Sequence, residues 1–245
     1  MVTSYIVNPC EKLFDHQYIL YDADAVPKLE VISFDPQELA ERHALIGEVL
    51  GRGPTYFIRI EGNDWVLRHY HRGGIVGRFL KDSYLWTGIH RTRAWREWRM
   101  LGKLWEWGLP VPRPIVARVL RRGPFYKADI ITQRLTNTRS LTELIRERSL
   151  NKQKWKAIGI CIRRFHGAGV YHPDITADNI LLTQEKDVYL IDFDNCELRD
   201  QCQGWRLKNL ARLRRSLIKR RSLYDSFYFS DGDWQVLCEG YGDMG

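Results

Sequence analysis

Three side chains that carry oxygen ligands lie close together in the second half of the sequence, and their types and spacing suit phosphoryl transfer. Asn179 follows Asp174 by five residues, and Asp192 follows Asn179 by thirteen. In such a set one carboxylate accepts the proton of an attacking hydroxyl, while an amide oxygen and a second carboxylate hold Mg²⁺ against nucleotide phosphates. Mg²⁺ prefers hard oxygen ligands of this kind. The alternative, that these residues only form turns, leaves their spacing unexplained.

The elements around these residues are predicted to place them in a loop and at a strand end. Asn151 can cap a long helix, because apolar residues recur after it at helical spacing. Two short apolar strands follow, Ile180–Thr183 and Val188–Asp192. This order puts Asp174 in the loop between the helix and the hairpin, and it puts Asp192 at the end of the second strand.

Upstream, the sequence is mainly of the strand type. The first 45 or so residues have weak periodicity and are predicted to be irregular or partly helical. Tyr56–Ile60 and Trp65–Tyr70 are β-type runs joined by the turn sequence Glu61–Asp64, which predicts a hairpin. Phe125–Thr132 is predicted to form another strand.

Helical patterns occupy most of the remainder. From Thr92 the apolar residues recur at helical spacing. Ser140 with Glu143 offers a capping box for a short helix. The chain from about Gly204 onwards again has a helical pattern.

The composition is that of a globular protein, with 44% hydrophobic and 28% charged residues. Strands first and helices afterwards predict an α+β fold with two lobes. We expect a single domain over residues 1–245, with a small β-rich N-lobe over about 30–134 and a reduced helical C-lobe over about 135–245. The longest uncharged run, Met1–Cys10, has ten residues, so neither a membrane-spanning segment nor a secretory signal is expected. Five scattered cysteines argue against a disulfide framework or a zinc site.

Excess positive charge is concentrated in one segment near the C-terminus. The net charge is +8, and Trp205–Ser222 contains eight basic residues and no acidic one. Such a block indicates a polyanionic partner: nucleic acid, anionic lipid or a phosphorylated substrate. In a helix, its leucines would lie in the core, and its basic side would meet lipid headgroups or substrate phosphates or simply be solvated. The two stripes are Lys208, Arg212, Arg215 and Lys219, and Leu207, Leu210, Leu213 and Leu217.

The segments His172-Pro173-Asp174, Asn179 and Asp192-Phe193 resemble the catalytic loop and the metal loop of protein kinases. The resemblance implies that Asp174 is the catalytic base and that Asn179 and Asp192 are ligands of Mg²⁺. Asp194 stands where protein kinases have glycine, and about 53 residues remain after Asp192, too few for a peptide-binding platform. A small-molecule or glycolipid acceptor is therefore favoured over a protein.

The same resemblance implies an ATP site in the β-rich part. Arg68 stands where kinases have the phosphate-binding lysine, and arginine can bind a phosphate or a carboxylate bidentately. Glu97 is the best-placed helix partner for Arg68, the alternative being one more solvated charge. The glycines before the first hairpin suit a phosphate-binding loop or a plain tight turn. The residues expected to bind ATP are Gly51, Gly53, Arg68, Glu97, Gln133 and Leu135, of which the last two lie where the lobes join.

Further segments resemble the 3-deoxy-D-manno-octulosonic acid (Kdo) kinases of the lipopolysaccharide core kinase family, which has a protein-kinase-like fold. Arg68-His69-Tyr70-His71-Arg72-Gly73-Gly74 is the most particular of them, with Tyr84-Leu85-Trp86 and Leu109–Pro114 in support. The resemblance extends from about Arg52 to Ser222. It implies ATP-dependent phosphorylation of Kdo, at the 4-hydroxyl, on Kdo-lipid IVA, the lipid A precursor. That step belongs to lipopolysaccharide core biosynthesis at the cytoplasmic face of the bacterial inner membrane.

Two other functions stay open at this point. One is a related core heptose kinase or an atypical protein kinase. The other is a non-catalytic module that binds a nucleotide or nucleic acid, which the basic block motivates. Because Asp174, Asn179 and Asp192 are all present, we favour a catalytic protein and expect no nucleic-acid partner. The basic helix over 205–222 is instead expected to dock on an anionic membrane surface as part of a peripheral membrane protein.

Other basic and imidazole side chains lie near these motifs. Arg72, Arg78 and Lys81 can bind the Kdo carboxylate or a lipid A phosphate, although plain solvation explains them equally well. His166 and His172 flank the catalytic loop without metal-ligand spacing around them. Both are therefore predicted to be structural hydrogen-bonding groups.

Overall fold

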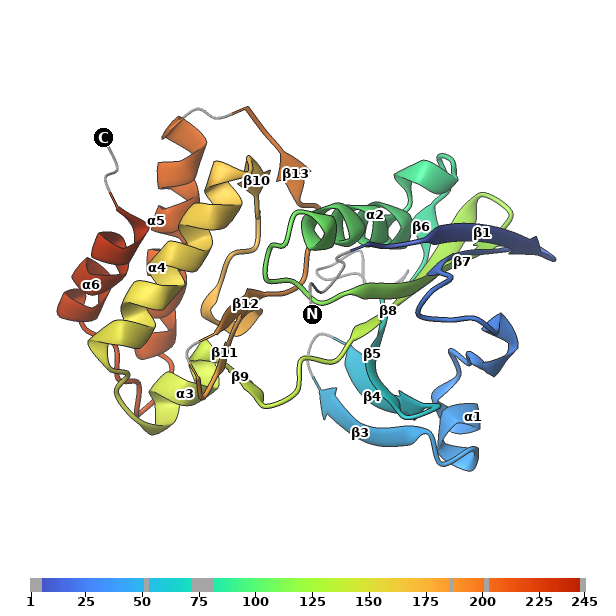
Figure 1. The fold of residues 1–245 in the computed structure, drawn as a ribbon, viewed down its shortest axis with the longest axis horizontal. Coiled ribbons are helices and arrows are strands. Elements are labelled where there is room, and N and C mark those ends of the chain that lie inside the picture. Colours follow the sequence, from blue (N-terminus) through green and yellow to red (C-terminus); the bar gives the residue numbers. More distant parts are fainter. Residues whose placement is uncertain (1–5, 51–52, 72–81, 186, 201–202, 243–245) are drawn as a thin grey trace. The chain divides into compact units, whose positions relative to one another are not determined.

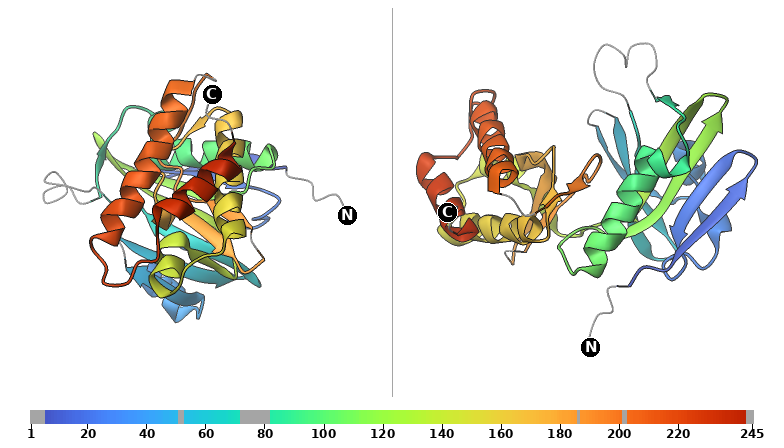
Figure 2. Two further views of the ribbon diagram at one scale, coloured as in Figure 1. Left: turned by 90° about the vertical axis from the view of Figure 1, so that its left-hand side faces the viewer. Right: turned by 90° about the horizontal axis from the view of Figure 1, so that it is seen from above.

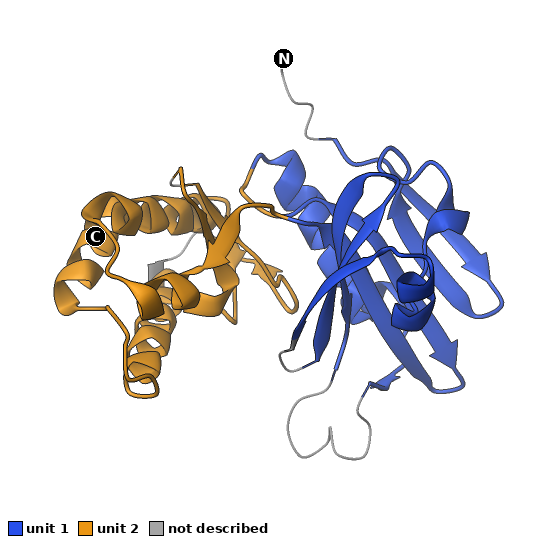
Figure 3. Cartoon of the chain, turned by 90° about the horizontal axis from the view of Figure 1, so that it is seen from below, with its two compact units in different colours: residues 1–108, 112–134 blue, residues 109–111, 135–245 orange. Residues whose placement is uncertain are grey.

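A computed structural model describes residues 6–50, 53–71, 82–185, 187–200 and 203–242. The chain divides into two compact units, of which unit 1 comprises residues 1–108 and 112–134 and unit 2 comprises residues 109–111 and 135–245 (Figure 3). Antiparallel sheets and helices occur together, which confirms the predicted α+β class (Figure 1).

Unit 1 is built on an antiparallel sheet with the strand order β1-β2-β7-β8-β5-β4-β3, and β6 pairs with β8. Short helical turns lie in its connections: η1 (Leu29–Val31), α1 (Pro36–Glu41) and η3 (Ile89–Arg91). The strands are β1 (Pro9–Phe14), β2 (Gln17–Asp22), β3 (Leu45–Leu50), β4 (Pro54–Ile60), β5 (Asn63–His69), β6 (Tyr84–Leu85), β7 (Pro114–Arg122) and β8 (Phe125–Gln133).

The predicted hairpin of β4 and β5 is confirmed, and the N-terminal residues are partly helical as predicted, but the prediction missed two strands there. β4 and β5 pair across a turn in which Glu61 and Gly62 both have positive φ. Within residues 6–45, β1 and β2 form a second hairpin that extends the sheet, and η1 and α1 are the helical part. β1 is an edge strand with mostly exposed residues. It therefore lacks the apolar alternation by which strands are recognised in a sequence.

One long helix, α2 (Arg93–Glu106), covers a face of this sheet (Figure 2). Its apolar side buries Ala94, Trp98 and Leu101, as the helical spacing predicted. Glu97 lies on the same buried side of the helix. The sheet and α2 thus fix a carboxylate inside unit 1.

Unit 2 is mainly helical. A three-stranded sheet has the order β12-β11-β9, and β10 pairs with β13, among the residues that the structure describes. The helices are α3 (Leu141–Glu147), α4 (Lys152–Gly167), η4 (Ala177–Asn179), α5 (Gln203–Arg221) and α6 (Asp231–Tyr241). The strands are β9 (Thr138–Ser140), β10 (Val170–Tyr171), β11 (Ile180–Thr183), β12 (Val188–Leu190) and β13 (Glu197–Leu198).

The helix caps and a close helix contact explain how unit 2 is assembled. The predicted capping box of Ser140 and the Asn151 cap are both confirmed. Helices α4 and α6 lie side by side (Figure 2). A Cβ atom on Gly159 would lie 2.0 Å from the Leu237 carbonyl oxygen, and one on Gly240 would lie 2.2 Å from the Lys156 carbonyl oxygen. Two glycines therefore allow the backbones to meet.

Helix α5 only partly follows the predicted apolar stripe. Leu210, Leu213 and Leu217 are buried, but Leu207 is 44% exposed, so its placement in the core was wrong. Trp205 and Asn209 occupy the buried positions of the first turns instead. Among the described residues, no helix is both long and apolar enough to cross a membrane.

Candidate active site

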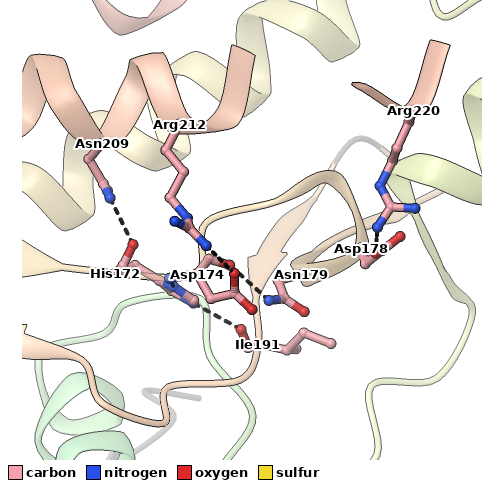
Figure 4. A network of polar contacts seen from close by, with 8 residues as sticks. All are labelled: His172, Asp174, Asp178, Asn179, Ile191, Asn209, Arg212 and Arg220. Atoms are coloured by element: carbon pink, nitrogen blue, oxygen red, sulfur yellow. Dashed lines mark hydrogen bonds and ion pairs between the residues drawn. The ribbon is translucent and has the colours of Figure 1, made fainter. Parts of the chain in front are cut away.

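The loop between β10 and β11 brings the predicted base close to one of the predicted metal ligands (Figure 4). Asn179, the last residue of η4, donates a hydrogen bond from Nδ2 to the Asp174 carbonyl oxygen over 2.9 Å. The backbone N–H of Asp174 donates to His172 Nδ1 over 3.2 Å. His172 Nε2 in turn donates to the Ile191 carbonyl oxygen over 3.0 Å. The imidazole therefore ties the loop to the residue that precedes Asp192.

Asn179 and Asp192 offer an oxygen donor set. The Ile191 backbone N–H donates to the Asn179 carbonyl oxygen over 3.1 Å, which links the two predicted ligands through the backbone. Because Asn179 Nδ2 is bound to a carbonyl, its amide oxygen remains an acceptor. Asp192 has a φ of 63°, in the left-handed region that Asp and Asn adopt more readily than most residues.

The chemistry of this donor set fits Mg²⁺. Within the described residues, no three His, Cys, Asp or Glu side chains gather into a metal-binding group. The predicted site contains one carboxylate and one amide, so it does not depend on such a group. Mg²⁺ keeps several waters and is commonly held by one or two carboxylates together with substrate phosphates.

A buried chain of hydrogen bonds anchors the loop to three helices. Asn209 on α5 donates from Nδ2 to the His172 carbonyl oxygen over 2.7 Å. Its Oδ1 accepts from His166 Nε2 on α4 over 3.0 Å. His166 Nδ1 then accepts from the Tyr241 hydroxyl on α6 over 2.9 Å. Because the carbonyl can only accept, each partner along the chain has a defined donor or acceptor role.

Burial favours the neutral form of both histidines. It lowers the pKa of His166 to about 4, although the hydrogen bond with Asn209 opposes the shift. Burial likewise lowers the pKa of His172, against the hydrogen bond with the Ile191 carbonyl. The prediction that both are structural hydrogen-bonding groups is confirmed.

Two arginines of α5 pair with carboxylates of the catalytic loop. Arg212 Nη2 lies 2.7 Å from Asp174 Oδ1, and Arg220 pairs with Asp178. The sequence had suggested that Arg212 belongs to a stripe facing lipid headgroups or substrate phosphates. In the structure, the Arg212 side chain contacts Asp174, the predicted base. Neither this pair nor the role of Asn209 was predicted. The position of the polar Asn209 next to buried leucines could have indicated a buried hydrogen bond.

Unit 1 brings together Arg68 and Glu97. Arg68 on β5 places Nη2 at 2.5 Å from Glu97 Oε1 and 2.6 Å from Oε2. The Tyr70 hydroxyl donates to Glu97 Oε2 over 2.5 Å. The Glu97 side chain is only 2% exposed. The alternative that Glu97 is a solvated helix charge is therefore wrong, while nucleotide binding by this pair stays a prediction.

The remaining predicted nucleotide ligands have simpler surroundings. A Cβ atom on Gly53 would lie 2.0 Å from His71 Cδ2, so this position excludes any side chain while His71 keeps its place. Gln133 is the exposed last residue of β8. The Leu135 carbonyl oxygen accepts a hydrogen bond from the Thr138 hydroxyl. Gly51 lies outside the described residues, as do Arg72, Arg78 and Lys81.

An antiparallel sheet with one covering helix, followed by a helical unit that carries this loop, defines the protein-kinase-like class of folds. The family model of the lipopolysaccharide kinase (Kdo/WaaP) family matches residues 37–241. The chain therefore belongs to this family, and it is a phosphotransferase of the kinase class. The resemblance noted in the sequence is confirmed.

Individual relatives cover nearly the whole chain. The 3-deoxy-D-manno-octulosonic acid kinase of Photobacterium profundum is 37% identical over 94% of this chain and 97% of its own length. The enzyme of the same name from Vibrio vulnificus (strain YJ016) has the same identity and coverage. That of Haemophilus influenzae (strain 86-028NP) is 37% identical over 93% of this chain and 97% of its own length.

Proposed function

We propose that this chain transfers the γ-phosphoryl group of ATP to a hydroxyl of Kdo on Kdo-lipid IVA, the lipid A precursor. The observation that carries the proposal is the loop in which Asn179 is hydrogen-bonded to Asp174 and linked by its carbonyl to Ile191, next to Asp192. Relatives that are 37% identical and bear the name of Kdo kinases support Kdo as the acceptor sugar.

The residues of unit 2 divide the chemistry among them. The Asp174 carboxylate accepts the proton of the acceptor hydroxyl as phosphoryl transfer proceeds. His172 and Asn209 keep the backbone around Asp174 in place through their hydrogen bonds. Asn179 and Asp192 would hold Mg²⁺, which when bound offsets charge on the transferred phosphoryl group.

Unit 1 is proposed to bind ATP. Arg68, oriented by Glu97, directs its guanidinium toward the phosphates in place of the usual lysine. Gly51 and Gly53 are assigned to the phosphate-binding loop on their resemblance to the glycine-rich loop of kinases. Gln133 of unit 1 and Leu135, which follows unit 1 in the chain, are proposed to contact the adenine through their backbone.

The acceptor position and the place of action complete the proposal. The phosphorylated group is the 4-hydroxyl of Kdo, and the reaction belongs to lipopolysaccharide core biosynthesis at the cytoplasmic face of the bacterial inner membrane. Exposed basic residues of α5 would dock the protein peripherally on anionic lipid. Each such residue contributes about 1 kcal/mol near the membrane surface, and the candidates are Lys208, Arg215 and Lys219.

Mass spectrometry of the acceptor tests the proposal. Purified Kdo-lipid IVA incubated with the protein, ATP and Mg²⁺ is expected to gain the mass of one phosphate, and NMR of the product is expected to place it at the 4-hydroxyl. Core oligosaccharide with heptose and a general protein substrate serve as alternative acceptors. Transfer to either of these with none to Kdo would overturn the proposal and assign a heptose kinase or a protein kinase instead.

A further inference from the structure

Helix α5 turns basic side chains toward the catalytic loop. Arg212 and Arg220, about two helical turns apart, each pair with a carboxylate of that loop (Figure 4). Arg212 is bonded to the carboxylate of the proposed base itself. A cation from α5 therefore lies directly against the proposed base.

Arg212 is not needed to hold the loop. Its side chain is 46% exposed and that of Asp174 is 34% exposed, and ion pairs that exposed contribute about 0–1 kcal/mol to stability. Asn209, one turn earlier on α5, already anchors the loop by its buried bond to the His172 carbonyl. A role for Arg212 in the chemistry accounts better for its position than a role in folding.

The Arg212 guanidinium has further N–H donors beside the Asp174 carboxylate. Within the described part of the chain, Asp174 takes one of the five N–H groups of Arg212. An acceptor hydroxyl has to lie within hydrogen-bonding distance of the Asp174 carboxylate for its proton to be taken. Groups attached near that hydroxyl then lie within reach of the remaining N–H donors, whose planar arrangement matches a carboxylate.

The proposed acceptor sugar is itself an acid. Its carboxylate and the Asp174 carboxylate repel each other when the hydroxyl approaches, because like charges brought together oppose binding. A cation placed between the two offsets this repulsion. The Arg212 guanidinium already lies against the Asp174 carboxylate.

We propose that Arg212 binds the carboxylate of the acceptor sugar while it contacts Asp174, and so selects an acidic sugar over a neutral one. This inference rests on the proposed function. It makes α5 part of the acceptor site, in addition to the membrane contact proposed for other basic residues of the same helix.

A cycle of enzyme and substrate variants tests the inference. The two acceptors are Kdo-lipid IVA and the same molecule with its Kdo carboxyl converted to the methyl ester. The unmodified enzyme is expected to lose roughly 10- to 100-fold in kcat/KM on the ester, the range for a charged hydrogen bond. Arg212→Gln is expected to lose a similar factor on the natural acceptor, with less than about a threefold further loss on the ester.

A matched control is available on the same helix. Arg214 Nη2 pairs with Asp231 Oδ1 over 3.0 Å, and its side chain is also 46% exposed. Arg214→Gln is expected to keep the unmodified enzyme's preference for the free acid. Because the preference is a ratio measured within one protein sample, the amount of folded enzyme cancels.

The possible results separate the two proposals. Equal discrimination against the ester by the unmodified enzyme and by Arg212→Gln would overturn the assignment of Arg212 alone. So would a loss by Arg212→Gln that disappears on an acceptor lacking the lipid A phosphates, since the arginine would then serve a phosphate. No transfer by the unmodified enzyme to the natural acceptor would overturn the proposed function and this inference with it.

Discussion

Two arginine–carboxylate pairs, one in each unit, have the same chemistry and opposite surroundings. In unit 1, Glu97 is buried and receives both Arg68 and the Tyr70 hydroxyl. In unit 2, Asp174 is a third exposed and pairs with Arg212 through one oxygen. Breaking a buried pair strands a charge and costs about 3–5 kcal/mol, whereas an exposed pair contributes about 0–1 kcal/mol.

The difference separates a fixed element from an exchangeable one. The Arg68–Glu97 pair is held by a buried carboxylate that also receives the Tyr70 hydroxyl, so it is suited to hold an arginine in one orientation. The Arg212–Asp174 pair can open or take on a further anion at little cost in stability. A catalytic carboxylate has to have that freedom, because it must accept a proton during turnover.

The largest change in stability is expected for the buried pair. Glu97→Gln removes the buried carboxylate that pairs with Arg68 and is expected to lower the free energy of unfolding by about 3–5 kcal/mol. Urea denaturation measures the loss. Glu106→Gln, at an exposed position of the same helix, is the control and is expected to change stability by less than about 0.5 kcal/mol.

A double variant sharpens this result. Arg68→Met with Glu97→Met removes both charges and is expected to be more stable than either single variant, because no buried charge is left unpaired. Losses that simply add would show that the two side chains act independently, contrary to the view of a coupled pair.

The second largest change in stability is expected for Asn209, which anchors the catalytic loop. Asn209→Ala leaves the His172 carbonyl oxygen and His166 Nε2 without their hydrogen-bond partner, and is expected to cost about 1–3 kcal/mol. Activity is expected to fall with it, since the loop then loses its buried hydrogen bond to α5. Ser216→Ala on the same helix serves as the control in both thermal unfolding and activity assays, and an equally small effect of both variants would contradict the anchoring role.

The same chain of hydrogen bonds predicts a pH dependence. The pKa of His166 is about 4 in the folded protein and 6.5 ordinarily, so the unfolded chain binds more protons between these values. The free energy of unfolding therefore falls as pH decreases from about 6.5 to 4, by about 2 kcal/mol at pH 5. Denaturation at pH 7 and pH 5 measures it, and a His166→Gln variant with an unchanged pH dependence would refute this origin.

The smallest change in stability is expected for the exposed pair. Arg212→Gln is expected to alter the free energy of unfolding by less than about 1 kcal/mol. A loss as large as that of Glu97→Gln in the same denaturation experiment would remove the contrast between the two pairs.

Which parts of the site can be predicted from the sequence depends on how far apart the contacting residues lie along the chain. Asp174, Asn179 and Asp192 are recognisable because loop and hairpin keep them close along the chain. The contacts of α5 with the loop cannot be recognised in the sequence, since Arg212 lies 38 residues from Asp174 and Asn209 lies 37 residues from His172. Only the packing of α5 on the loop reveals these contacts.

Unit 1 shows the same limit in its sheet. The hairpin of β4 and β5 follows from alternation and a turn sequence, both local signals. The exposed β1 strand gives no apolar pattern and is defined by its pairing with β2. The pairing of Arg68 with Glu97 could be anticipated only by resemblance to kinases, since the two residues belong to separate elements.

The central claim is that the exposed carboxylate of Asp174 serves chemistry and not stability. The most direct test is the rate of phosphate transfer to Kdo-lipid IVA by Asp174→Asn, measured by mass spectrometry beside its unfolding free energy, with Asp178→Asn as the loop control. We predict that kcat falls about 10²- to 10⁴-fold while stability changes by less than about 1 kcal/mol. Transfer at the unmodified rate by a fully folded Asp174→Asn protein would contradict the account.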